Sequence, residues 1–329
     1  SALLDDLALY GRAEADYNLD MTTVSGQAAE HFARRIVQRL HDAGHIAYFA
    51  GGCVRDRLMH RTPRDFDVAT SARTEQVLAL FPRARLVGAA FGVVLAQERQ
   101  PDRSRLQVEV ATFRADGAYS DGRHPDSVRF TTPEEDARRR DFTCNGLFLD
   151  PLADADAGGQ LHDYVGGRED IEARRLRAIG TPAHRFAEDH LRMLRAVRFA
   201  ARLAFTIDPA TSAAIDALQA DIARMSRERI GEEIRLMLEH PTRAAQPIGA
   251  LPLLARFPVL FAEVFGLNPP PPEATWPLLS NLPATGITRP IALMALLRDL
   301  AGNLDPDNQH PNIRTLRARL MLSNEETDL

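Results

Sequence analysis

The stretch Gly51-Gly52-Cys53-Val54-Arg55-Asp56, followed shortly by Asp65-Phe66-Asp67-Val68-Ala69, decides how the first half of this chain is expected to fold. Residues 45–50 have the composition of a strand that ends at the two glycines, and residues 65–69 predict a second strand. On a strand, Asp65 and Asp67 project from one face, whereas Phe66 and Val68 point to the other side, into the core. The pattern therefore predicts a pair of carboxylates on the surface of a sheet.

The flanking residues predict more strands and short helices around this pair. Further strands are expected over residues 85–88, 91–97 and 106–113, and helices over residues 54–59 and 74–81. A helix that starts after Ser25 should bury one apolar face and end at Gly44; its apolar residues are Phe32, Ile36, Val37 and Leu40. Thr132 should cap a helix from Pro133, with Glu135 closing a capping box, and residues 115–130 should form a polar loop.

From Pro182 onward the apolar spacing becomes helical. The predicted fold class is therefore α+β, with an N-terminal mixed sheet followed by an all-α part. We expect an arm over residues 1–26, a head over 27–165, a helical neck over 166–240 and a helical body over 241–329. The body lacks a clear last helix, so a reduced or truncated tail is expected there.

Composition narrows the function classes. The 329 residues carry 40 basic and 45 acidic side chains, a net charge of −5, so binding to nucleic acid would need a local basic patch. All the basic residues are arginine, which excludes mechanisms that need a lysine. Two cysteines, Cys53 and Cys144, give neither a disulfide framework nor a metal-site spacing and are expected to be core thiols. With no long apolar run and no leader pattern, we expect a cytoplasmic protein without a membrane partner.

A third carboxylate, Glu109, lies among alternating apolar residues. If its strand pairs beside Asp65 and Asp67, three carboxylates converge, and such oxygen ligands suit Mg²⁺. Two such ions can activate an attacking hydroxyl and stabilise a leaving pyrophosphate. The bare backbone N–H groups of Gly51 and Gly52 could approach an anion, and Arg55 follows on the next turn.

Five segments in order resemble the motifs of class II tRNA nucleotidyltransferases and bacterial poly(A) polymerases, within the polymerase-β-like nucleotidyltransferase superfamily. The first is the stretch quoted at the start. The other four are Arg139-Arg140-Asp141-Phe142-Thr143-Cys144-Asn145-Gly146-Leu147, Asp163-Tyr164-Val165-Gly166-Gly167-Arg168-Glu169-Asp170-Ile171, Glu188-Asp189-His190-Leu191-Arg192-Met193-Leu194-Arg195 and Ser226-Arg227-Glu228-Arg229-Ile230-Gly231-Glu232-Glu233. The resemblance covers residues 46–240 and fades beyond them. Cys144 and Gly146 depart from the apolar residue and the alanine that are usual in the second motif.

The resemblance implies template-independent addition of C and A, from CTP and ATP, to the 3′ end of tRNA. Asp65, Asp67 and Glu109 would hold the catalytic Mg²⁺ ions while the 3′-hydroxyl attacks the α-phosphate. The nucleotide-binding residues implied in the head are Gly51, Gly52, Arg55, Arg140, Asp141 and Asn145. The third motif would be a hinge.

The fourth motif is the expected reader of the base. Asp189 and Arg192 are three residues apart and so would share a helix face. A carboxylate accepts from an exocyclic amine and a guanidinium donates to ring acceptors, so this pair could select C or A and reject U and G. Glu188 would orient Arg192. Arg195 and Arg198 continue the stripe and would face triphosphate or RNA.

Three alternatives stay open at this point. Poly(A) polymerases share these motifs but typically carry a basic pair in the region that here reads Leu86-Val87-Gly88-Ala89-Ala90-Phe91-Gly92. The segment over residues 114–125 resembles the flexible loop of CCA-adding members, which enzymes that add only CC often lack; an enzyme that adds only the terminal A fits as well. A catalytically dead RNA-binding protein is a remote alternative, against which the three acidic residues argue.

Overall fold

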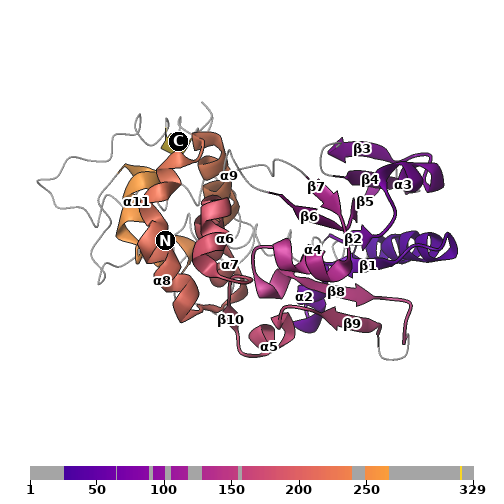
Figure 1. Cartoon of the computed structure of the whole chain (residues 1–329), viewed down its shortest axis with the longest axis horizontal. Helices are drawn as coiled ribbons and strands as arrows, with labels where there is room; N and C mark the ends of the chain where they lie inside the picture. The colour runs from indigo at the N-terminus through magenta and orange to yellow at the C-terminus, as the bar shows by residue number, and fades with distance from the viewer. Residues whose placement is uncertain are drawn as a thin grey trace, which may run out of the picture. The chain divides into compact units, whose positions relative to one another are not determined.

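The computed structural model describes residues 26–63, 65–88, 92–100, 105–117, 128–154, 158–238, 249–266 and 319–320. These residues form two compact units (Figure 1). The sheet unit holds the described residues up to Ala173 together with Arg177–Gly180, and the helical unit holds Arg174–Leu176 and the described residues from Thr181 onward. The chain therefore passes from one unit to the other three times between Ala173 and Thr181.

A seven-stranded sheet in the order β3-β4-β5-β2-β1-β8-β9 forms the centre of the sheet unit (Figure 1). Its strands are β1 (Ala47–Ala50), β2 (Asp67–Thr70), β3 (Arg85–Gly88), β4 (Val93–Arg99), β5 (Arg105–Thr112), β8 (Leu147–Asp150) and β9 (Gln160–Asp163). The pair β2 and β5 is parallel and the other neighbouring pairs are antiparallel, so the sheet is mixed as predicted. A separate antiparallel pair joins β6 (Arg114–Asp116) to β7 (Val128–Phe130).

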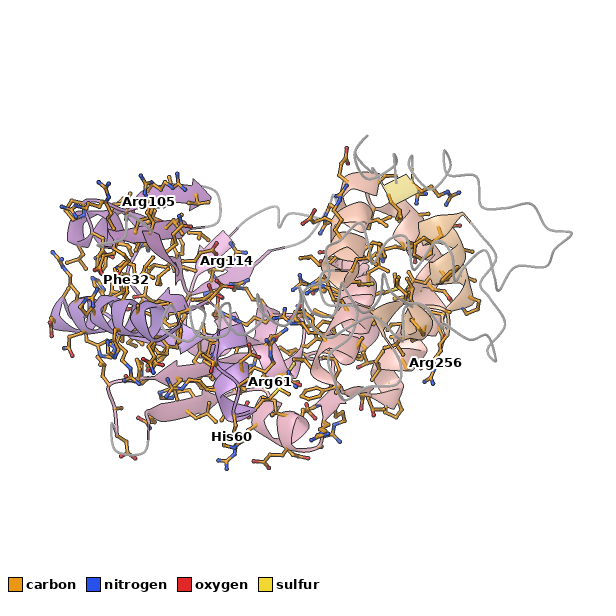
Figure 2. All side chains as sticks on the ribbon, turned by 180° about the vertical axis from the view of Figure 1, so that it is seen from behind. Phe32, His60, Arg61, Arg105, Arg114 and Arg256 are labelled. Atoms are coloured by element: carbon orange, nitrogen blue, oxygen red, sulfur yellow. The ribbon has the colours of Figure 1, made fainter. Side chains whose placement is uncertain are left out.

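Helices complete the sheet unit. They are a long helix over residues 26–42, followed by α2 (Gly52–Leu58), α3 (Thr74–Leu80), α4 (Pro133–Arg139) and α5 (Gly167–Glu172), with a 3₁₀ turn over Thr143–Asn145. The long helix buries the apolar face that its sequence predicts, and Figure 2 shows Phe32 on its inner side. It ends before Gly44, whose positive φ of 82° allows the chain to turn into β1. In this turn His41 Nε2 donates to the carbonyl of Ala47 at 3.0 Å.

The helical unit is built from α6 (Pro182–Glu188), α7 (Leu191–Leu203), α8 (Pro209–Leu218), α9 (Arg227–Leu238), α10 (Ala250–Leu254) and α11 (Pro258–Phe265), with a 3₁₀ segment over Gln219–Arg224. A short parallel pair joins β10 (Arg175–Leu176) to β11 (Thr206–Ile207). Asp208 caps α8 by accepting hydrogen bonds from the backbone of Ala210 and Thr211. The apolar stripes predicted for this part supply its core, because Leu194, Val197, Ile215, Ile222, Ile234 and Leu238 are all buried.

The predicted α+β class is confirmed, but several local predictions are wrong. β2 begins at Asp67, so Asp65 lies just before the strand. Residues 114–116 and 128–130 pair as strands, although the whole segment 115–130 was expected to be a loop. Thr132 does cap α4 by accepting from the N–H of Glu135 at 3.4 Å, but the Glu135 side chain pairs with Arg129 instead of completing a capping box.

Several predictions fall on residues outside the described ranges. These are residues 1–25 of the arm that was predicted over 1–26, the tip of the loop within 114–125, residues 89–91 and most of the body over 241–329. Within the described residues, the structure has no helix that is both long and apolar enough to cross a membrane.

Candidate active site

The parallel pair of strands brings two of the predicted acidic residues together. Asp67 begins β2, and Glu109 on β5 is its direct register partner. Registered residues of parallel strands project to the same face, and adjacent strands lie about 4.8 Å apart, so the two carboxyl groups are close neighbours. Both side chains are exposed, whereas Val68 and Val110, the next residues along each strand, are buried on the opposite face. The sheet therefore displays a carboxylate pair to solvent.

Asp67 is the electrostatic centre of this group. The surrounding protein atoms partly desolvate its carboxyl group, although the side chain keeps contact with solvent, and this raises its pKa to about 6. The negative charge of Glu109 raises the pKa further, the guanidinium of Arg140 lowers it, and Asp65 raises it. The same interactions place Asp65 near Asp67 even though it precedes the strand. Acidic groups at this spacing destabilise one another when all are ionised, and a bound cation would relieve that repulsion.

The three carboxylates are neighbours but not a closed ligand cluster. Across the described part of the chain, no group of three Asp, Glu, His or Cys side chains is already gathered as a metal-binding set. The donor type still fits a hard cation, because all three side chains offer oxygen ligands.

Arg140 is fixed beside this group by a buried partner. Asp136, which is 1% exposed, pairs with Arg139 at 2.7 Å and with Arg140 at 3.0 Å. Burial alone would raise the pKa of Asp136, but the charges of Arg140 and Arg139 outweigh burial and hold that pKa below its usual value. The Arg140 guanidinium also lies 4.9 Å from the ring centre of Phe148. This buried carboxylate was missed in the sequence, although its spacing of three and four residues to the two arginines is a readable signal.

The prediction that the backbone N–H groups of the glycine pair approach an anion is not met at Gly51. The N–H of Gly51 donates to the carbonyl of Leu147 at 3.0 Å and is therefore not directed at an anion. Gly51 has a φ of 69°, and a Cβ there would lie 3.0 Å from Arg140 Nη1. Glycine is needed at this position for its backbone conformation and for the close approach of Arg140. Gly52 is the first residue of α2.

Arg55, Asn145 and Asp141 form one buried chain of hydrogen bonds. Arg55 donates through Nη1 to Asn145 Oδ1 at 2.6 Å and through Nε to Asp56 Oδ1 at 2.9 Å. Asn145 in turn donates through Nδ2 to Asp141 Oδ1 at 3.1 Å. Arg55 is only 3% exposed, so in this structure its guanidinium orients Asn145 rather than facing solvent. The first and second motifs are thus tied to each other.

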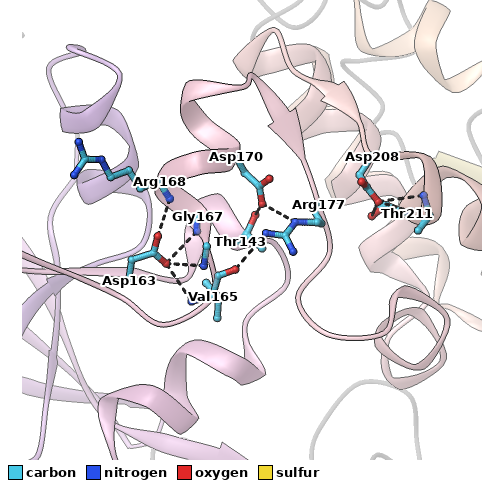
Figure 3. Close-up of polar contacts among 11 residues, drawn as sticks. Thr143, Asp163, Val165, Gly167, Arg168, Asp170, Arg177, Asp208 and Thr211 are labelled. Atoms are coloured by element: carbon cyan, nitrogen blue, oxygen red, sulfur yellow. Dashed lines mark hydrogen bonds and ion pairs between the residues drawn. The ribbon is translucent and has the colours of Figure 1, made fainter.

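The third motif is held by two aspartates (Figure 3). Asp163 accepts hydrogen bonds from four successive backbone N–H groups, those of residues 165–168, and so fixes the turn into α5. Asp170, which is fully buried, accepts from Thr143 Oγ1 at 2.6 Å and from Arg177 Nε at 2.8 Å. α5 is therefore joined both to the second motif and to the segment Arg177–Gly180.

In the helical unit, Glu188 and Arg192 interact as predicted. Arg192 Nη1 contacts Glu188 Oε2 at 2.5 Å and also donates to the carbonyl of Arg185 at 2.8 Å. Arg185 itself pairs with the same Glu188 oxygen at 2.8 Å. Arg192 is 8% exposed, so these contacts fix a largely buried guanidinium. Glu188 therefore orients Arg192.

Asp189 does not share a continuous helix with Arg192, contrary to the prediction. α6 ends at Glu188 and α7 begins at Leu191, and the backbone of Asp189 is extended, with φ −150° and ψ 103°. The carboxylate is instead held by the N–H of Leu191 at 3.1 Å and by Arg229 Nη2 of α9 at 2.8 Å. Spacing alone could not reveal this break.

Arg195 and Arg198, which were expected to face triphosphate or RNA, both lie beside Glu233 of α9. Arg198 is 7% exposed and donates through Nε to Glu233 Oε2 of α9 at 2.7 Å, and Arg195 Nη1 lies 3.6 Å from Glu233 Oε1. The charge of Arg198 is thus neutralised inside the helical unit. Glu233 and Arg229 both belong to the fifth motif, but their partners lie 35 and 40 residues away and could not be read from the sequence.

Both cysteines are core thiols, as predicted. Cys53 and Cys144 are buried, and burial raises the pKa of each thiol to about 12. A Cβ at Gly146 would lie 2.8 Å from Val165 Cγ2, so the glycine that replaces the usual alanine has a packing role.

The predicted site residues thus form two groups, each described within its own unit. The sheet unit brings together the acidic residues and the residues of the first two motifs: Gly51, Gly52, Arg55, Asp65, Asp67, Glu109, Arg140, Asp141 and Asn145. The helical unit brings together Glu188, Asp189, Arg192, Arg195 and Arg198.

Comparison with known proteins assigns families to both parts. Residues 47–177 match the model of the poly A polymerase head domain, and residues 204–246 match that of the probable RNA and SrmB-binding site of polymerase A. The CCA-adding enzyme of Geobacillus stearothermophilus is 42% identical over 221 residues, which are 67% of this chain and 51% of that protein. The CCA-adding enzyme of Bacillus subtilis is 40% identical over 205 residues, 62% of this chain and 49% of that protein. The chain thus covers about half of the length of these relatives.

Solved structures of CCA-adding enzymes also resemble this chain. The crystal structure of the Bacillus stearothermophilus CCA-adding enzyme in complex with CTP matches with a TM-score of 0.71 and 34% identity, covering 90% of this chain and 67% of that one. The Thermotoga maritima CCA-adding enzyme complexed with tRNA matches with a TM-score of 0.64 at 21% identity, covering 91% of this chain and 67% of that one, and shows the fold alone. This chain belongs to the family of poly(A) polymerases and CCA-adding enzymes.

Proposed function

We propose that this chain is a template-independent nucleotidyltransferase that adds C and A, from CTP and ATP, to the 3′ end of tRNA and releases pyrophosphate. The observation that carries the proposal is the register pairing of Asp67 with Glu109 beside Asp65 and Arg140. The relatives named as CCA-adding enzymes support the choice of substrates.

Asp65, Asp67 and Glu109 would hold Mg²⁺. Their oxygen donors suit this ion. Partial burial and then the repulsion from Glu109 and Asp65 raise the pKa of Asp67, and a bound divalent cation would relieve that repulsion. Bound there, Mg²⁺ would supply activation of the attacking hydroxyl and charge stabilisation on the leaving pyrophosphate.

The other residues of the sheet unit would bind the nucleotide and keep its site in shape. Arg140, fixed by Asp136, would carry positive charge to the triphosphate, and Gly51 gives it room. Asp141 and Asn145 would contact the sugar, with Arg55 acting through Asn145 rather than directly. In the first motif, the backbone of Gly52, the first residue of α2, would lie against the phosphates.

The helical unit would choose the base. Asp189 would accept from the exocyclic amine of C or A, and Arg192 would donate to the ring acceptors, with Glu188 holding Arg192. Because Arg198 is paired inside the unit, we assign it a structural role and leave Arg195, which is more exposed, as the contact to phosphate or RNA. The proposed domains remain a head over residues 27–165, a neck over 166–240 and a body over 241–329.

The test is nucleotide incorporation with Mg²⁺ on three tRNAs, which end before the CCA, after CC and after CCA. CTP and ATP are supplied separately and together. Stepwise addition that stops at CCA is the expected result. Extension of only the CC-ended tRNA would replace the proposal with an A-adding enzyme, and long adenosine tails would replace it with a poly(A) polymerase. No incorporation on any substrate would contradict the enzymatic proposal and favour the RNA-binding alternative.

A further inference from the structure

Register pairing sets a row of side chains across the sheet face that displays Asp67 and Glu109, which we call the carboxylate face. Glu109 of β5 pairs with Asp67 on one side and with Leu95 of β4 on the other. Leu95 in turn pairs with Arg85 of β3, which is exposed. Register partners on neighbouring strands project to the same face. The backbone of Arg85 therefore lies about 10 Å, or two strand spacings, from that of Glu109.

Two more arginines lie on the carboxylate face, farther along β4 and β5. Arg99 and Arg105 are direct register partners, and both side chains are exposed (Figure 2). Arg105 precedes Glu109 by four residues on the same strand, so it projects to the same face at a distance of about 13 Å. The exposed Gln107 lies between them. We call Arg85, Arg99 and Arg105 the arginine patch.

The positive charge of the arginine patch is not balanced within the part of the chain that the structure describes. None of its three arginines has an acidic partner there. Glu98, the acidic neighbour of Arg99, projects to the opposite face and pairs with Arg35 of the long helix. Arg99 and Arg105 stand directly opposite each other, and like charges in this arrangement destabilise a sheet. A bound anion would relieve their repulsion.

The arginine patch and Arg140 lie on opposite sides of the carboxylates. Arg140 lies over the ring of Phe148 of β8, and in the sheet order β8 and β1 are on one side of Asp67 whereas β4 and β3 are on the other side, beyond Glu109. In phosphoryl transfer the attacking and leaving oxygens are roughly in line, so they lie on opposite sides of the reacting phosphorus. A leaving pyrophosphate on the Arg140 side therefore places the attacking strand on the side of the arginine patch.

We propose that the arginine patch binds phosphates of the RNA substrate close to its reacting 3′ end. The inference rests on the proposed function, because that function places the 3′-hydroxyl at the carboxylates. Guanidinium groups without acidic partners pair strongly with phosphate oxygens, so an RNA backbone is the partner that this surface fits. The chain as a whole has a net charge of −5, so attraction of RNA depends on local patches of this kind. The contact holds the strand and does not read its sequence.

The test measures the affinity for a tRNA that ends before the CCA, by fluorescence anisotropy at several salt concentrations, together with KM for that tRNA and for CTP. In the double variant Arg99→Gln, Arg105→Gln, the Kd and KM for tRNA should rise about tenfold, with kcat and KM for CTP changed less than about twofold. The slope of log affinity against log salt should become shallower by about 1, because roughly two phosphate contacts are lost. Unchanged tRNA affinity and slope would overturn the proposal, as would a rise in KM for CTP in place of tRNA.

A matched control removes two charges from the opposite side of the sheet. Arg35 and Arg39 are exposed residues of the long helix, and the double variant Arg35→Gln, Arg39→Gln changes the net charge by the same amount. It should change the affinity for tRNA by less than about twofold, because these charges lie away from the proposed path of the strand. Equal weakening by the two double variants would reveal an effect of net charge alone and overturn the proposal.

The fold of the test variant is a second control. Arg99→Gln, Arg105→Gln should melt at the same temperature as the unmodified protein or higher, because two facing like charges are removed. If this variant does not fold, Arg85→Gln carries the test, with a rise of about threefold in the Kd for tRNA expected and an unchanged Kd overturning the proposal. Arg99→Lys, Arg105→Lys keeps both charges and should retain most of the affinity, since lysine binds phosphate as a point charge. A loss as large as that of the glutamine variant would contradict a phosphate contact.

Neutral phosphates test where the RNA lies. A tRNA whose last few phosphates before the 3′-hydroxyl are methylphosphonates should bind the unmodified protein and the double variant Arg99→Gln, Arg105→Gln with similar affinity, because the contacts in question are already absent. A tenfold difference that persists with this tRNA would overturn the placement beside the 3′ end.

The failure of this inference is distinguishable from the failure of the proposed function. Absence of C and A addition by the unmodified protein would contradict the function itself and the inference with it. If the unmodified protein adds CCA and the double variant Arg99→Gln, Arg105→Gln binds and extends tRNA equally well, only the inference fails.

Discussion

Glu233 of α9 reaches Arg198 of α7 through a hydrogen-bonded ion pair of 2.7 Å, and the two side chains are only 5% and 9% exposed. An ion pair at this depth contributes modestly as a whole, because both charges lose their hydration, but loss of one partner leaves an uncompensated buried charge.

We therefore expect Glu233→Gln to lower the free energy of unfolding by about 3 kcal/mol. The double variant Arg198→Met, Glu233→Gln should be less destabilised than the two single variants added together, because neither of the two buried charges is left without the other. Urea unfolding curves of the four proteins measure this coupling. Glu232, whose side chain is 60% exposed, gives the control: Glu232→Gln should change stability by less than about 0.5 kcal/mol. Additive effects would mean that the pair is not coupled.

The second prediction concerns the carboxylate pair of the sheet. Asp67→Asn should lower nucleotide incorporation by roughly 10²-fold or more, because it removes an oxygen ligand and a negative charge from the proposed metal site. The same change should keep or raise the melting temperature in the absence of metal, since partial burial, followed by the charges of Glu109 and Asp65, disfavours the ionised form of Asp67. Glu98→Gln, which alters an exposed carboxylate of β4 paired with Arg35, should leave activity unchanged. Full activity in Asp67→Asn would refute the metal-site assignment.

The third prediction is a dependence of stability on pH that comes from Asp136. Its pKa is lower in the folded protein than in the unfolded chain, so its contribution is present above the unfolded value of about 4 and is lost as the pH falls through the folded value. Asp136→Asn should lower the free energy of unfolding by about 3 kcal/mol at pH 7, because it leaves two guanidinium groups without their buried partner.

Unfolding by urea at pH 7 and at pH 3 measures this dependence. The gap between Asp136→Asn and the unmodified protein should shrink at the lower pH, where the wild-type carboxyl group begins to take up its proton. Glu134→Gln alters an exposed pair with Arg138 on the same helix and should show a gap below about 0.5 kcal/mol at both values. A gap for Asp136→Asn that grows toward acid would contradict the assigned direction of the pKa shift.

The fourth prediction concerns the two cysteines. Cys53 and Cys144 are buried, and each has a pKa of about 12, so almost no thiolate is present at pH 8. The native protein should not react with iodoacetamide over the time in which the urea-unfolded protein is modified twice, as mass spectrometry would show. Rapid modification of one cysteine in the native state would place that thiol at the surface.

Structural features that depend on residues close together in the sequence were predicted better than those that depend on residues far apart in it. The apolar spacing of the helix over residues 26–42 and the alternation around Phe66 and Val68 reflect local periodicity, and both predictions are confirmed. β8 was missed because Leu147-Phe148-Leu149 is a short apolar run that overlaps the end of the second motif. The pairing of 114–116 with 128–130 closes a segment whose composition is that of a loop.

In the candidate site, too, local features were predictable from the sequence and contacts between distant residues were not. The sequence placed Glu109 beside the aspartates only on the condition that their strands pair, and the pairing of β2 with β5 meets that condition for Asp67. The break at Asp189, by contrast, is set by contacts with Leu191 and with Arg229 of another helix, which spacing along one helix does not contain. The anion contact expected from Gly51 failed because its N–H is already used by Leu147.

The crossing of the chain between the two units has a practical consequence for fragments of the protein. Arg177–Gly180 belongs to the sheet unit, where the N–H of Thr143 donates to the carbonyl of Arg177 and the N–H of Ile179 donates to the carbonyl of Asp141. The preceding Arg175–Leu176 pairs with β11 in the helical unit. No single cut therefore yields both units with their own residues complete. A sheet fragment should extend to Gly180 and a helical fragment should start at Arg174, so that the two recombinant pieces overlap and each retains the short segment that it needs to fold.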